Sequence, residues 1–504
     1  MKLVSCFLML AMLIVLAFGC MAPQQAEMPS LNFERIAQET ILTEINFDSW
    51  VPLSLRVSPD GRTVAYVNKV DDKQVVVING KEEKRYDQIA AYSLVFSPDS
   101  QRLAYVVHTE EGLIVVVNDQ ESEVYDDIGL SSLVFSPDSQ SFAYTAKTAN
   151  SWFVVVDGRP GKRFDAISPL TLKFNPNSQE VVYVAGLQDK QFVQIGEEIG
   201  GMYEEIKTDA ISFSPDGTHL AYVARVGNKW AVVKDGIEGK QYDEISPTSL
   251  VFSPDSQSLA YAAKSGDRWV AVLNGEEFKP YQVIELNENS FSPDGKRFAY
   301  IARTWGDDSS EGKEWCMVLD EKEGKRYPDI GGSSFVFSPD SQRLAYVALA
   351  EGGHSHGEEH LEGAEHSHNE EWCVVADGKE GNKYQGISTG VPVFSPDSQY
   401  LAYAAGSENG WFLVVNDREQ KLYDNIGTGL IFSPDSKYLA YVAQTGDELF
   451  VVVNGQEGKH YDGVLNLYGG KLTFDSPDTL NYIAVDGGNV YRVEEKIVEK
   501  QAEP

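Results

Sequence analysis

The sequence of 504 residues is poor in several residue types and patterns. It has four cysteines and eight histidines, and 42 Lys and Arg against 76 Asp and Glu leave a formal net charge of −34. A field of that sign repels nucleic acid and anionic lipid headgroups, so nucleic acid is not an expected partner, and basic partners or divalent cations are favoured. After residue 18 no stretch is long and apolar enough to span a bilayer. A P-loop and a dinucleotide fingerprint are both lacking.

The first twenty residues predict an export signal. Lys2 precedes an uncharged run over 3–18, which is short for a membrane span and ends at Gly19-Cys20. The run Leu16-Ala-Phe-Gly-Cys20 resembles a bacterial lipobox, in which Cys20 becomes the lipidated first residue. The resemblance implies an exported lipoprotein, periplasmic or on the cell surface, that meets the membrane through its lipid anchor only. Ordinary secretion and a retained anchor are the alternatives.

A ten-residue pattern repeats along most of the remaining chain. One copy reads Phe96-Ser-Pro-Asp-Ser-Gln-Arg-Leu-Ala-Tyr105, and the first six steps between copies are each 39 residues. A fixed period near forty residues indicates an array of similar small units. The position of Phe96 is filled in the eleven copies by Val57, Phe96, Phe135, Phe174, Phe213, Phe252, Phe291, Phe337, Phe394, Phe432 and Phe474.

Each copy predicts four short strands. An apolar run enters the Ser-Pro-Asp turn, in which Pro sets φ and Ser and Asp can bond nearby backbone amides. Two runs rich in β-branched and aromatic residues follow, and the second of them closes on hairpin dipeptides such as Asp157-Gly158 and Asn454-Gly455. The fourth run carries an aromatic residue, 29 residues after the Phe position in eight of ten copies. Four antiparallel strands in about forty residues describe a propeller blade, so the predicted fold class is all-β.

These copies resemble the WD-like β-propeller repeats of the TolB family, whose units share the core apolar-Ser-Pro-Asp-Gly-Lys-x-Ile/Leu-Ala-Phe/Tyr. The resemblance covers about residues 44–495 and recurs eleven times. It implies a propeller but says little of function, because such blades occur in translocation proteins, peptidase accessory domains and lyases. TolB carries a globular α/β domain before its propeller. Residues 21–43 leave no room for one and are expected to be a tether with one or two helical turns, so the Tol role is not carried over.

The two ends of the array are expected to complete each other. Phe47-Asp48 has the spacing of the Tyr-Asp pair that precedes each next copy, so Glu44–Trp50 predicts a fourth strand without a blade, while 474–493 supplies three strands without a fourth. We therefore expect the N-terminal strand to complete the last of eleven four-stranded blades and leave no open edge. Eleven exceeds the four to eight blades usual for one ring, so we expect two tandem rings of about six and five blades, with one large ring as the alternative. The predicted divisions are a lipoprotein signal peptide (1–20), a tether (21–43), two propeller halves (44–285 and 286–496) and a tail (497–504).

Two copies carry insertions between their second and third strands. The first includes 305–312, and the second, 351–371, holds five of the eight histidines among glutamates. Imidazole with carboxylate suits zinc, nickel or copper, and His-rich tracts indicate metal binding by composition. The alternative is a solvated acidic loop that holds no metal, since the spacing fits no ordered zinc signature. The candidate ligands are His354, His356, His360, His366 and His368.

The other residues with chemical potential are predicted to be structural. Cys316 and Cys373 hold equivalent places in adjacent copies, too far apart for a disulfide unless the blades splay, and are expected as buried thiols. Two G-x-S-x-G matches, 353–357 and 386–390, lack the strand-to-helix turn of a hydrolase elbow. The tryptophans that open the third strands are expected in blade-to-blade packing, with sugar stacking as the alternative. They are Trp152, Trp230, Trp269, Trp315, Trp372 and Trp411.

The sequence therefore favours a non-catalytic envelope lipoprotein whose propeller binds a protein or a polysaccharide. A metal-handling protein that uses the His-rich loop is the first alternative, with zinc or nickel as the only predicted cofactor. A lyase or hydrolase working from a propeller face is the second alternative. It would need a non-repeating cluster of acid, base and aromatic residues, and no such cluster and no catalytic residue can be assigned from the sequence.

Overall fold

The computed structural model describes residues 28, 31–304, 314–332, 334–351, 370–388, 391–427, 429–465 and 471–500, and within them the regular structure is almost entirely β-strand. The described residues contain no α-helix and five short 3-10 helices. No helix among them is long and apolar enough to cross a membrane. The predicted signal peptide, Cys20 and the five histidines of the His-rich loop lie outside the described residues.

The strands form eleven antiparallel sheets, numbered here 1 to 11 in chain order. The second strands of the sheets are β3 (Val64–Val70), β8 (Leu103–Thr109), β13 (Phe142–Thr148), β18 (Val181–Leu187), β22 (Leu220–Val226), β27 (Leu259–Ser265), β31 (Ala299–Arg303), β36 (Leu344–Glu351), β41 (Leu401–Ser407), β46 (Leu439–Thr445) and β51 (Thr479–Asp486). The third strands are β4 (Lys73–Ile78), β9 (Gly112–Val117), β14 (Ser151–Val156), β19 (Lys190–Ile195), β23 (Lys229–Lys234), β28 (Arg268–Leu273), β32 (Trp315–Leu319), β37 (Glu371–Ala376), β42 (Gly410–Val415), β47 (Glu448–Val453) and β52 (Asn489–Glu499).

The outer and inner edges of the sheets are less regular. The fourth, outer strands are β5 (Lys81–Tyr86), β10 (Gln120–Glu121), β15 (Arg159–Pro160), β20 (Glu198–Ile199), β24 (Ile237–Tyr242), β29 (Glu276–Glu277), β33 (Lys322–Tyr327), β38 (Lys379–Tyr384), β43 (Arg418–Tyr423), β48 (Gln456–Tyr461) and, in sheet 11, β1 (Phe33–Glu44). The first, inner strands are β2 (Arg56–Val57), β21 (Ile206–Phe213) and β30 (Val283–Glu285), or a pair of short pieces. Those pairs are β6 (Gln88–Ile89) with β7 (Val95–Phe96), β11 (Asp127–Ile128) with β12 (Val134–Phe135), β16 (Ala166–Ile167) with β17 (Lys173–Phe174), β25 (Glu244–Ile245) with β26 (Val251–Phe252), β34 (Asp329–Ile330) with β35 (Val336–Phe337), β39 (Gly386–Ile387) with β40 (Val393–Phe394), β44 (Asn425–Ile426) with β45 (Ile431–Phe432), and β49 (Gly463–Leu465) with β50 (Thr473–Ser476).

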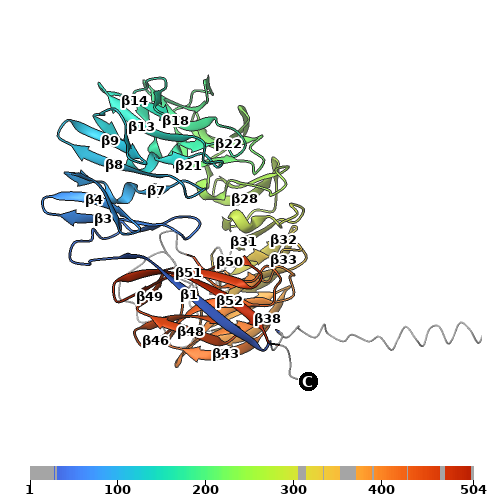
Figure 1. Ribbon diagram of the computed structural model, residues 1–504. Coiled ribbons are helices and arrows are strands. Elements are labelled where there is room, and N and C mark those ends of the chain that lie inside the picture. Colours follow the sequence, from blue (N-terminus) through green and yellow to red (C-terminus); the bar gives the residue numbers. More distant parts are fainter. Residues whose placement is uncertain are drawn as a thin grey trace, which may run out of the picture.

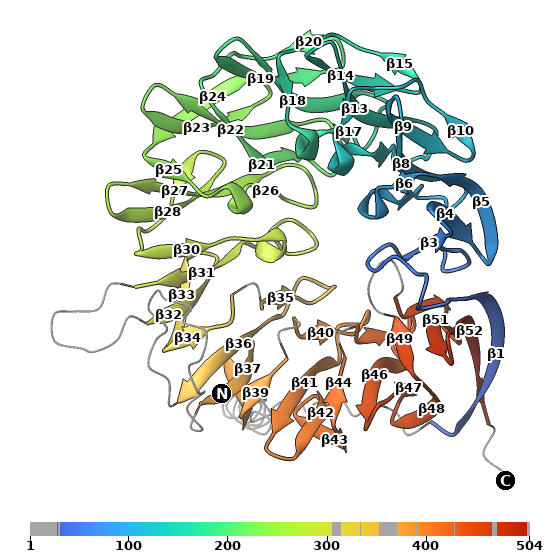
Figure 2. The ribbon, with the colours of Figure 1, turned by 90° about the vertical axis from the view of Figure 1, so that its left-hand side faces the viewer.

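Short 3-10 helices lie between the inner pieces of several sheets or just before the Ser-Pro-Asp turn, and Figure 2 shows them on the inner side of the ring. They are η1 (Ala91–Ser93), η2 (Leu130–Ser132), η3 (Pro169–Thr171), η4 (Pro247–Ser249) and η5 (Glu288–Ser290). In η1 and η2 the last residue is a serine, and its hydroxyl group holds the short helix in place. Ser93 Oγ donates to the Ala90 carbonyl at 2.7 Å and accepts from the Val106 amide of the second strand at 2.8 Å. The third strands close on residues with positive φ, 48° at Asp157 and 43° at Asn454, as the hairpin dipeptides predict.

Each sheet is covered on both faces by its neighbours, because apolar side chains of the second and third strands point alternately to the two sides. Val67 of sheet 1 packs with Tyr105 and Val116 of sheet 2. Equivalent clusters join every consecutive pair of sheets. One more cluster places Ile483 and Val490 of sheet 11 against sheet 1. The described sheets thus follow one another in a single circuit (Figures 1 and 2), which is a β-propeller arrangement.

This circuit corrects the expectation of two tandem rings. A ring of six blades would bring sheet 6 back against sheet 1, whereas Ala262 and Ala271 of sheet 6 pack against Tyr300 and Val318 of sheet 7. The predicted division between 285 and 286 falls inside sheet 7, directly after β30, and the junction of sheets 6 and 7 beside it is built like its neighbours. Because the junctions before and after this point are equivalent, the sheets continue in one circuit, as in the one-ring alternative.

The N-terminal strand does complete the last sheet, but it is not the segment that the spacing of Phe47-Asp48 predicts. Strand β1 pairs antiparallel with β52 from Phe33↔Glu499 to Glu44↔Asn489, and Figure 1 shows it lying along β52. The expected tether is therefore strand from residue 33 onward, not helical, and β52 continues to 499, past the predicted end at 496. Thr43 takes the place of the aromatic residue, with its Oγ1 3.5 Å from the Tyr66 hydroxyl. Phe47 lies in a turn and is exposed.

Candidate binding site on the inner wall of the ring

The aspartates of the Ser-Pro-Asp turns are used by the fold. Ser97 Oγ donates to Asp99 Oδ1 at 2.6 Å, and the Gln101 amide donates to the same oxygen at 3.1 Å. The Asp99 amide in turn donates to Ser139 Oγ of the next sheet at 2.9 Å. The hydroxyl of Ser97 is the largest cause of a lowered pKa at Asp99. The recurring Asp therefore shapes the turn, as predicted, and its Oδ1 is engaged there. The link that its amide makes to the neighbouring sheet was not predicted from the sequence.

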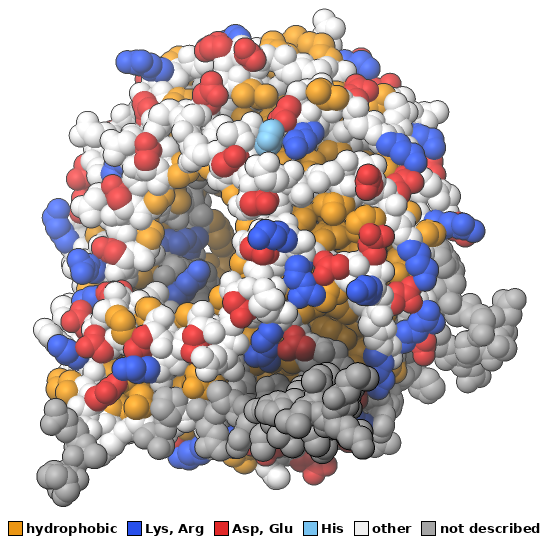
Figure 3. All heavy atoms as spheres, turned by 90° about the vertical axis from the view of Figure 1, so that its right-hand side faces the viewer, with side chains coloured by type: hydrophobic (Ala, Val, Ile, Leu, Met, Phe, Trp, Pro, Cys, Tyr) orange, Lys and Arg blue, Asp and Glu red, His pale blue; other side chains and the backbone are white. Residues whose placement is uncertain are grey.

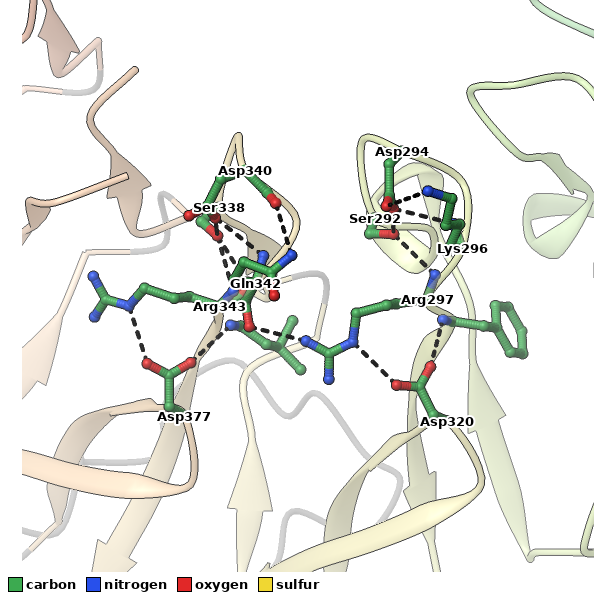
Figure 4. Close-up of polar contacts among 12 residues, drawn as sticks. Ser292, Asp294, Lys296, Arg297, Asp320, Ser338, Asp340, Gln342, Arg343 and Asp377 are labelled. Atoms are coloured by element: carbon green, nitrogen blue, oxygen red, sulfur yellow. Dashed lines mark hydrogen bonds and ion pairs between the residues drawn. The ribbon is translucent and has the colours of Figure 1, made fainter. Parts of the chain in front are cut away.

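Basic side chains on the same face tie the turns of neighbouring sheets together (Figure 4). Arg297 donates from Nε to Asp320 at 3.0 Å and from Nη1 to the Gln342 carbonyl of sheet 8 at 3.0 Å. Arg343 repeats the arrangement one sheet later, with Asp377 at 3.0 Å and the Ser398 carbonyl at 3.1 Å. Each of these two arginines thus pairs with an aspartate of its own sheet and binds a carbonyl of the next sheet, which ties the two sheets together.

On the outer edge, a lysine and a glutamate of adjacent sheets meet at six junctions. Lys84 Nζ lies 2.5 Å from Glu121 Oε1, which also accepts the hydroxyl hydrogen of Tyr86 at 2.8 Å. The hydrogen bonds from Lys84 and Tyr86 lower the pKa of Glu121. The pairs are Lys84–Glu121, Lys240–Glu277, Lys279–Glu323, Lys325–Glu380, Lys421–Glu457 and Lys459–Glu39. We call each pair an edge clasp. Because the pair recurs at six junctions, we interpret it as part of the scaffold.

The tryptophans and cysteines singled out in the sequence are packing residues. All six tryptophans are partly buried against the clusters between sheets, and some also lie beneath a cation, as Trp230 does with Lys207 Nζ 4.7 Å from its ring centroid. Cys316 and Cys373 are free and buried, in two different junction clusters, as predicted. Burial raises the pKa of both thiols to about 11. They are inert at neutral pH.

The predicted metal ligands are not placed by the structure. His354, His356, His360, His366 and His368 fall in 352–369, outside the described residues. Among the residues that are described, no group of three or more His, Cys, Asp or Glu could hold a metal ion. Of the two G-x-S-x-G matches, the one that begins at Gly386 starts on β39, an inner strand piece, so its serine has no strand-to-helix turn.

The feature that departs from the repeat lies at the inner edge of sheets 1 to 4. Leu53, Tyr92 and Leu170 each lie four residues before the position that Phe96 holds in its copy of the repeat. Their exposed fractions are 45%, 69% and 69%. Sheet 3 carries Leu130, also exposed, one residue earlier in its copy. The equivalent residues of the later copies are Asp209, Thr248, Asn287, Ser333, Gly390, Thr428 and Gly470. We call Leu53, Tyr92, Leu130 and Leu170 the interior arc.

The segments that carry the interior arc neighbour one another along the ring. The short helix η2 contacts both η1 and η3, and Arg56 of sheet 1 donates from Nη2 to the Tyr92 carbonyl at 3.4 Å. Inner strands add Lys173 and Lys207, whose ammonium groups reach backbone carbonyls of the next sheet at 3.0 and 2.7 Å. Figure 3 shows an opening in the middle of the molecule with basic side chains inside it. The inner wall is therefore apolar over four sheets and bordered by cations.

A separate hollow of about 870 Å³ lies between sheets 3 and 4, where β15 and β20 are only two residues long. One ion pair lies on its rim, where Lys162 Nζ is 3.2 Å from Glu197 Oε2. The hollow results from the short outer strands, and none of the buried side-chain atoms that lack a hydrogen-bond partner among the described residues belongs to its lining. Comparison of equivalent positions between copies could have found the interior arc from the sequence, whereas exposure at those positions required the structure.

Comparisons with known proteins give distant likenesses only. No family model matches the chain, and no curated protein matches it. Similar solved structures include one titled as the eukaryotic initiation factor, at 14% identity over 70% of this chain and 89% of that one with a TM-score of 0.38. The β-propeller domain of the Trilobed protease from Pyrococcus furiosus has 14% identity over 56% and 92%, with a TM-score of 0.27. TolB from Acinetobacter baumannii has 12% identity over 65% and 79%, with a TM-score of 0.22. At these values the likenesses carry no inference about what this chain binds.

Proposed function

We propose that this protein is a non-catalytic propeller of the cell envelope that binds a polypeptide segment through the interior arc. The observation that carries the proposal is the asymmetry of the inner wall. Leu53, Tyr92 and Leu170 expose apolar surface at a position where the seven later copies have polar residues or glycine. Exposed apolar residues that recur on neighbouring sheets of one wall are the kind of surface that a binding partner covers.

The chemistry of the wall favours a protein partner over a polysaccharide. Three of the four arc residues are leucines, whose side chains offer no hydrogen-bond donor to a sugar, and the tryptophans that could stack on sugar rings are partly buried between sheets. Arg56, Lys173 and Lys207 border the arc. The expected partner segment therefore has apolar side chains flanked by acidic ones.

The non-catalytic part of the proposal rests on the use of the repeated carboxylates. The Ser-Pro-Asp aspartates and the edge-clasp glutamates each accept hydrogen bonds that build the ring. A general acid or base needs a carboxyl group whose protons are available to a substrate.

Envelope location is proposed from the lipobox that ends at Cys20. Twelve residues separate Cys20 from Phe33 at the start of β1. Fully extended, the stretch from Cys20 to Phe33 spans at most about 47 Å, which would hold the ring close to the membrane that carries its lipid.

The test is capture of partners from detergent-solubilised envelope by the wild type and by a variant with Leu53→Ser, Tyr92→Ser and Leu170→Ser. A matched control replaces Leu187 and Ile237, exposed apolar residues outside the arc, by Ser. We expect one protein partner to be retained by the wild type and the control and lost from the arc variant, with unchanged thermal midpoints. Equal capture by all three proteins, or capture of a polysaccharide instead, would contradict the proposal.

A further inference from the structure

The closing seam, the junction between sheets 11 and 1, is built from different residues than the other ten junctions. In sheet 11, Asn481, Arg492 and Glu494 occupy positions that face the next sheet. The residues equivalent to Arg492 are apolar in every other sheet: Val76, Val115, Val154, Val193, Val232, Ala271, Met317, Val374, Leu413 and Val451. The position of Asn481 is Ala or Val in the other ten copies. Only the seam carries this polar set.

The polar set is ordered but incompletely satisfied. Arg492 donates from Nη2 to Asn481 Oδ1 at 2.8 Å and to Glu494 at 3.1 Å. The first bond fixes which way the Asn481 amide points, so that its Nδ2 is left as a donor. Asn481 Nδ2 and Arg492 Nε are both buried and have no hydrogen-bond partner among the residues that the structure describes. Asn481 is 7% exposed and the Arg492 side chain is 16% exposed. Buried donors without acceptors destabilise a fold, so their presence calls for a partner.

The seam also leaves space beside these donors. Gly295, which holds the fourth position of the Ser-Pro-Asp turn in sheet 7, approaches the turn of sheet 6 so closely that a Cβ would lie 2.6 Å from Asp255. Gly61, at the same position in sheet 1, has no atom within 4 Å of such a Cβ. A cavity of about 140 Å³ opens there, lined by Asp60, Gly61, Lys471, Asp475, Asn481 and Arg492 among others. We call it the seam pocket.

We propose that the seam pocket binds a small zwitterion of the α-amino acid class. Arg492, Asn481 and Lys471 supply donors for a carboxylate, and the two buried unpaired donors are the groups that such an acceptor would satisfy. Asp475 supplies an acceptor for an ammonium group in the same cavity, and so does Oδ2 of Asp60, because the bonds that hold this aspartate in its turn, from Ser58 Oγ and the Arg62 amide, both go to Oδ1. The volume suits a ligand as large as a few water molecules, which favours glycine, alanine or serine over larger amino acids. This site is independent of the interior arc and of the partner proposed there.

The test is calorimetric titration of the full chain with glycine, alanine and serine. Acetate and methylammonium serve as half-ligands, each carrying one of the two charges. We expect at least one amino acid to bind, and both half-ligands to bind at least about tenfold more weakly. If acetate alone matches the amino acids, or if no amino acid gives a binding heat or raises the thermal midpoint, the proposal is wrong.

Two variants restore the residue of the other sheets and should therefore fold: Arg492→Val and Asn481→Ala. Each is expected to raise the dissociation constant about tenfold to a hundredfold, because a charge-assisted or buried hydrogen bond is lost. The matched control is Lys234→Val, which changes the one charged residue at the position of Glu494 in another sheet and is expected to leave binding unchanged. Unchanged binding in both Arg492→Val and Asn481→Ala would overturn the assignment of the ligand to this pocket.

Discussion

Tyr461 donates its hydroxyl hydrogen to Glu39 at 2.7 Å, although 422 residues separate them in the chain. Lys459 Nζ lies 2.9 Å from the same carboxylate. Tyr86 and Lys84 meet Glu121 in the same way between two sheets that are consecutive in sequence. The N-terminal strand thus supplies to the junction between sheets 10 and 11 the glutamate that an ordinary fourth strand supplies elsewhere, and this edge clasp ties the strand that completes the last sheet to sheet 10.

Glu39→Gln should weaken this closure. The substitution removes the charge from a carboxylate that accepts from a hydroxyl and an ammonium group, and hydrogen bonds to charged groups are worth about 1.5–3 kcal/mol each. We expect the free energy of unfolding to fall by about 1–3 kcal/mol, measured by denaturant titration. Glu34→Gln on the same strand is the control, since Glu34 is exposed and pairs only with Lys500 at 3.4 Å. Equal losses in the two variants would contradict a role for the clasp.

Acid should destabilise the ring through the same carboxylates. Burial acts to raise the pKa of Glu39, but the hydrogen bonds from Tyr461 and Lys459 outweigh it and lower the pKa below 4.5. The Lys84 hydrogen bond lowers the pKa of Glu121, and Ser97 that of Asp99. A group whose folded pKa is lowered contributes stability that is present above its unfolded pKa and lost as pH falls through its folded pKa.

We therefore expect the thermal midpoint to be level from pH 7 to about 5 and to fall steadily below about pH 4.5. The decline should be shallower in Glu39→Gln, which has one titrating clasp fewer. A midpoint that rises on acidification would show that repulsion within a chain of net charge −34 outweighs the paired carboxylates.

The sequence is informative about each blade and much less so about how the blades assemble. The four strands, the Ser-Pro-Asp turn and the buried Cys316 follow from local patterns that every copy repeats. The number of rings depends on the small rotation between blades, which arises from packing distances that no single residue encodes. Strand β1 was not predicted because Phe47-Asp48 has the spacing of the Tyr-Asp pair of the repeat. In β1 the position of the aromatic residue is held by Thr43.

Both candidate sites were accessible in principle, because each is a departure from the repeat. Tyr92 and Leu170 differ from their later counterparts in sequence alone, as Arg492 does from ten apolar residues. The sequence does not show which of these side chains are exposed or which of them lie beside a cavity. Arg492 would be consistent with a surface strand until the structure places it beside a cavity with its Nε unpaired.

If Cys20 carries the lipid, its substitution should abolish anchoring to the membrane. Cys20→Ser removes the thiol that a lipobox cysteine uses, so labelled fatty acid should no longer be incorporated and the protein should leave the membrane fraction. Cys6→Ser is the control, because Cys6 lies within the apolar run and not at its end. Membrane retention of Cys20→Ser, equal to that of the control, would favour a retained signal anchor.

The His-rich segment predicts binding of zinc or nickel that depends on imidazole. Replacing His354, His356, His360, His366 and His368 by Asn should abolish the heat of titration with either metal, since softer nitrogen ligands are then lost. The control replaces Glu358, Glu359, Glu362, Glu365 and Glu370 by Gln and should keep most of the heat. Identical titrations of the wild type and the histidine variant would remove the metal-handling alternative.

The buried ion pair between β1 and β52 gives the most demanding test of the closing strand. Arg35 donates from Nε to Glu495 Oε2 at 2.7 Å and from Nη1 to the Val451 carbonyl at 3.0 Å, and both charged side chains are buried. Removing one partner of a buried pair leaves an uncompensated charge and costs about 3–5 kcal/mol. Arg35→Leu should therefore lower stability by that amount and speed amide exchange in β1 and β52 before other strands.

Two further variants separate the charge from the packing. Arg85→Leu is the control, since the Arg85 guanidinium is exposed and pairs with Glu82 at 2.9 Å, and it should cost less than about 1 kcal/mol. Arg35→Leu combined with Glu495→Gln removes the stranded charge while keeping an acceptor for the Tyr482 hydroxyl, which lies 2.6 Å from Glu495. It should recover much of the loss, because a neutral buried amide costs less than a lone carboxylate. If Arg35→Leu is no worse than Arg85→Leu, and β1 exchanges no faster than the other outer strands, then the ring does not depend on its N-terminal strand for closure.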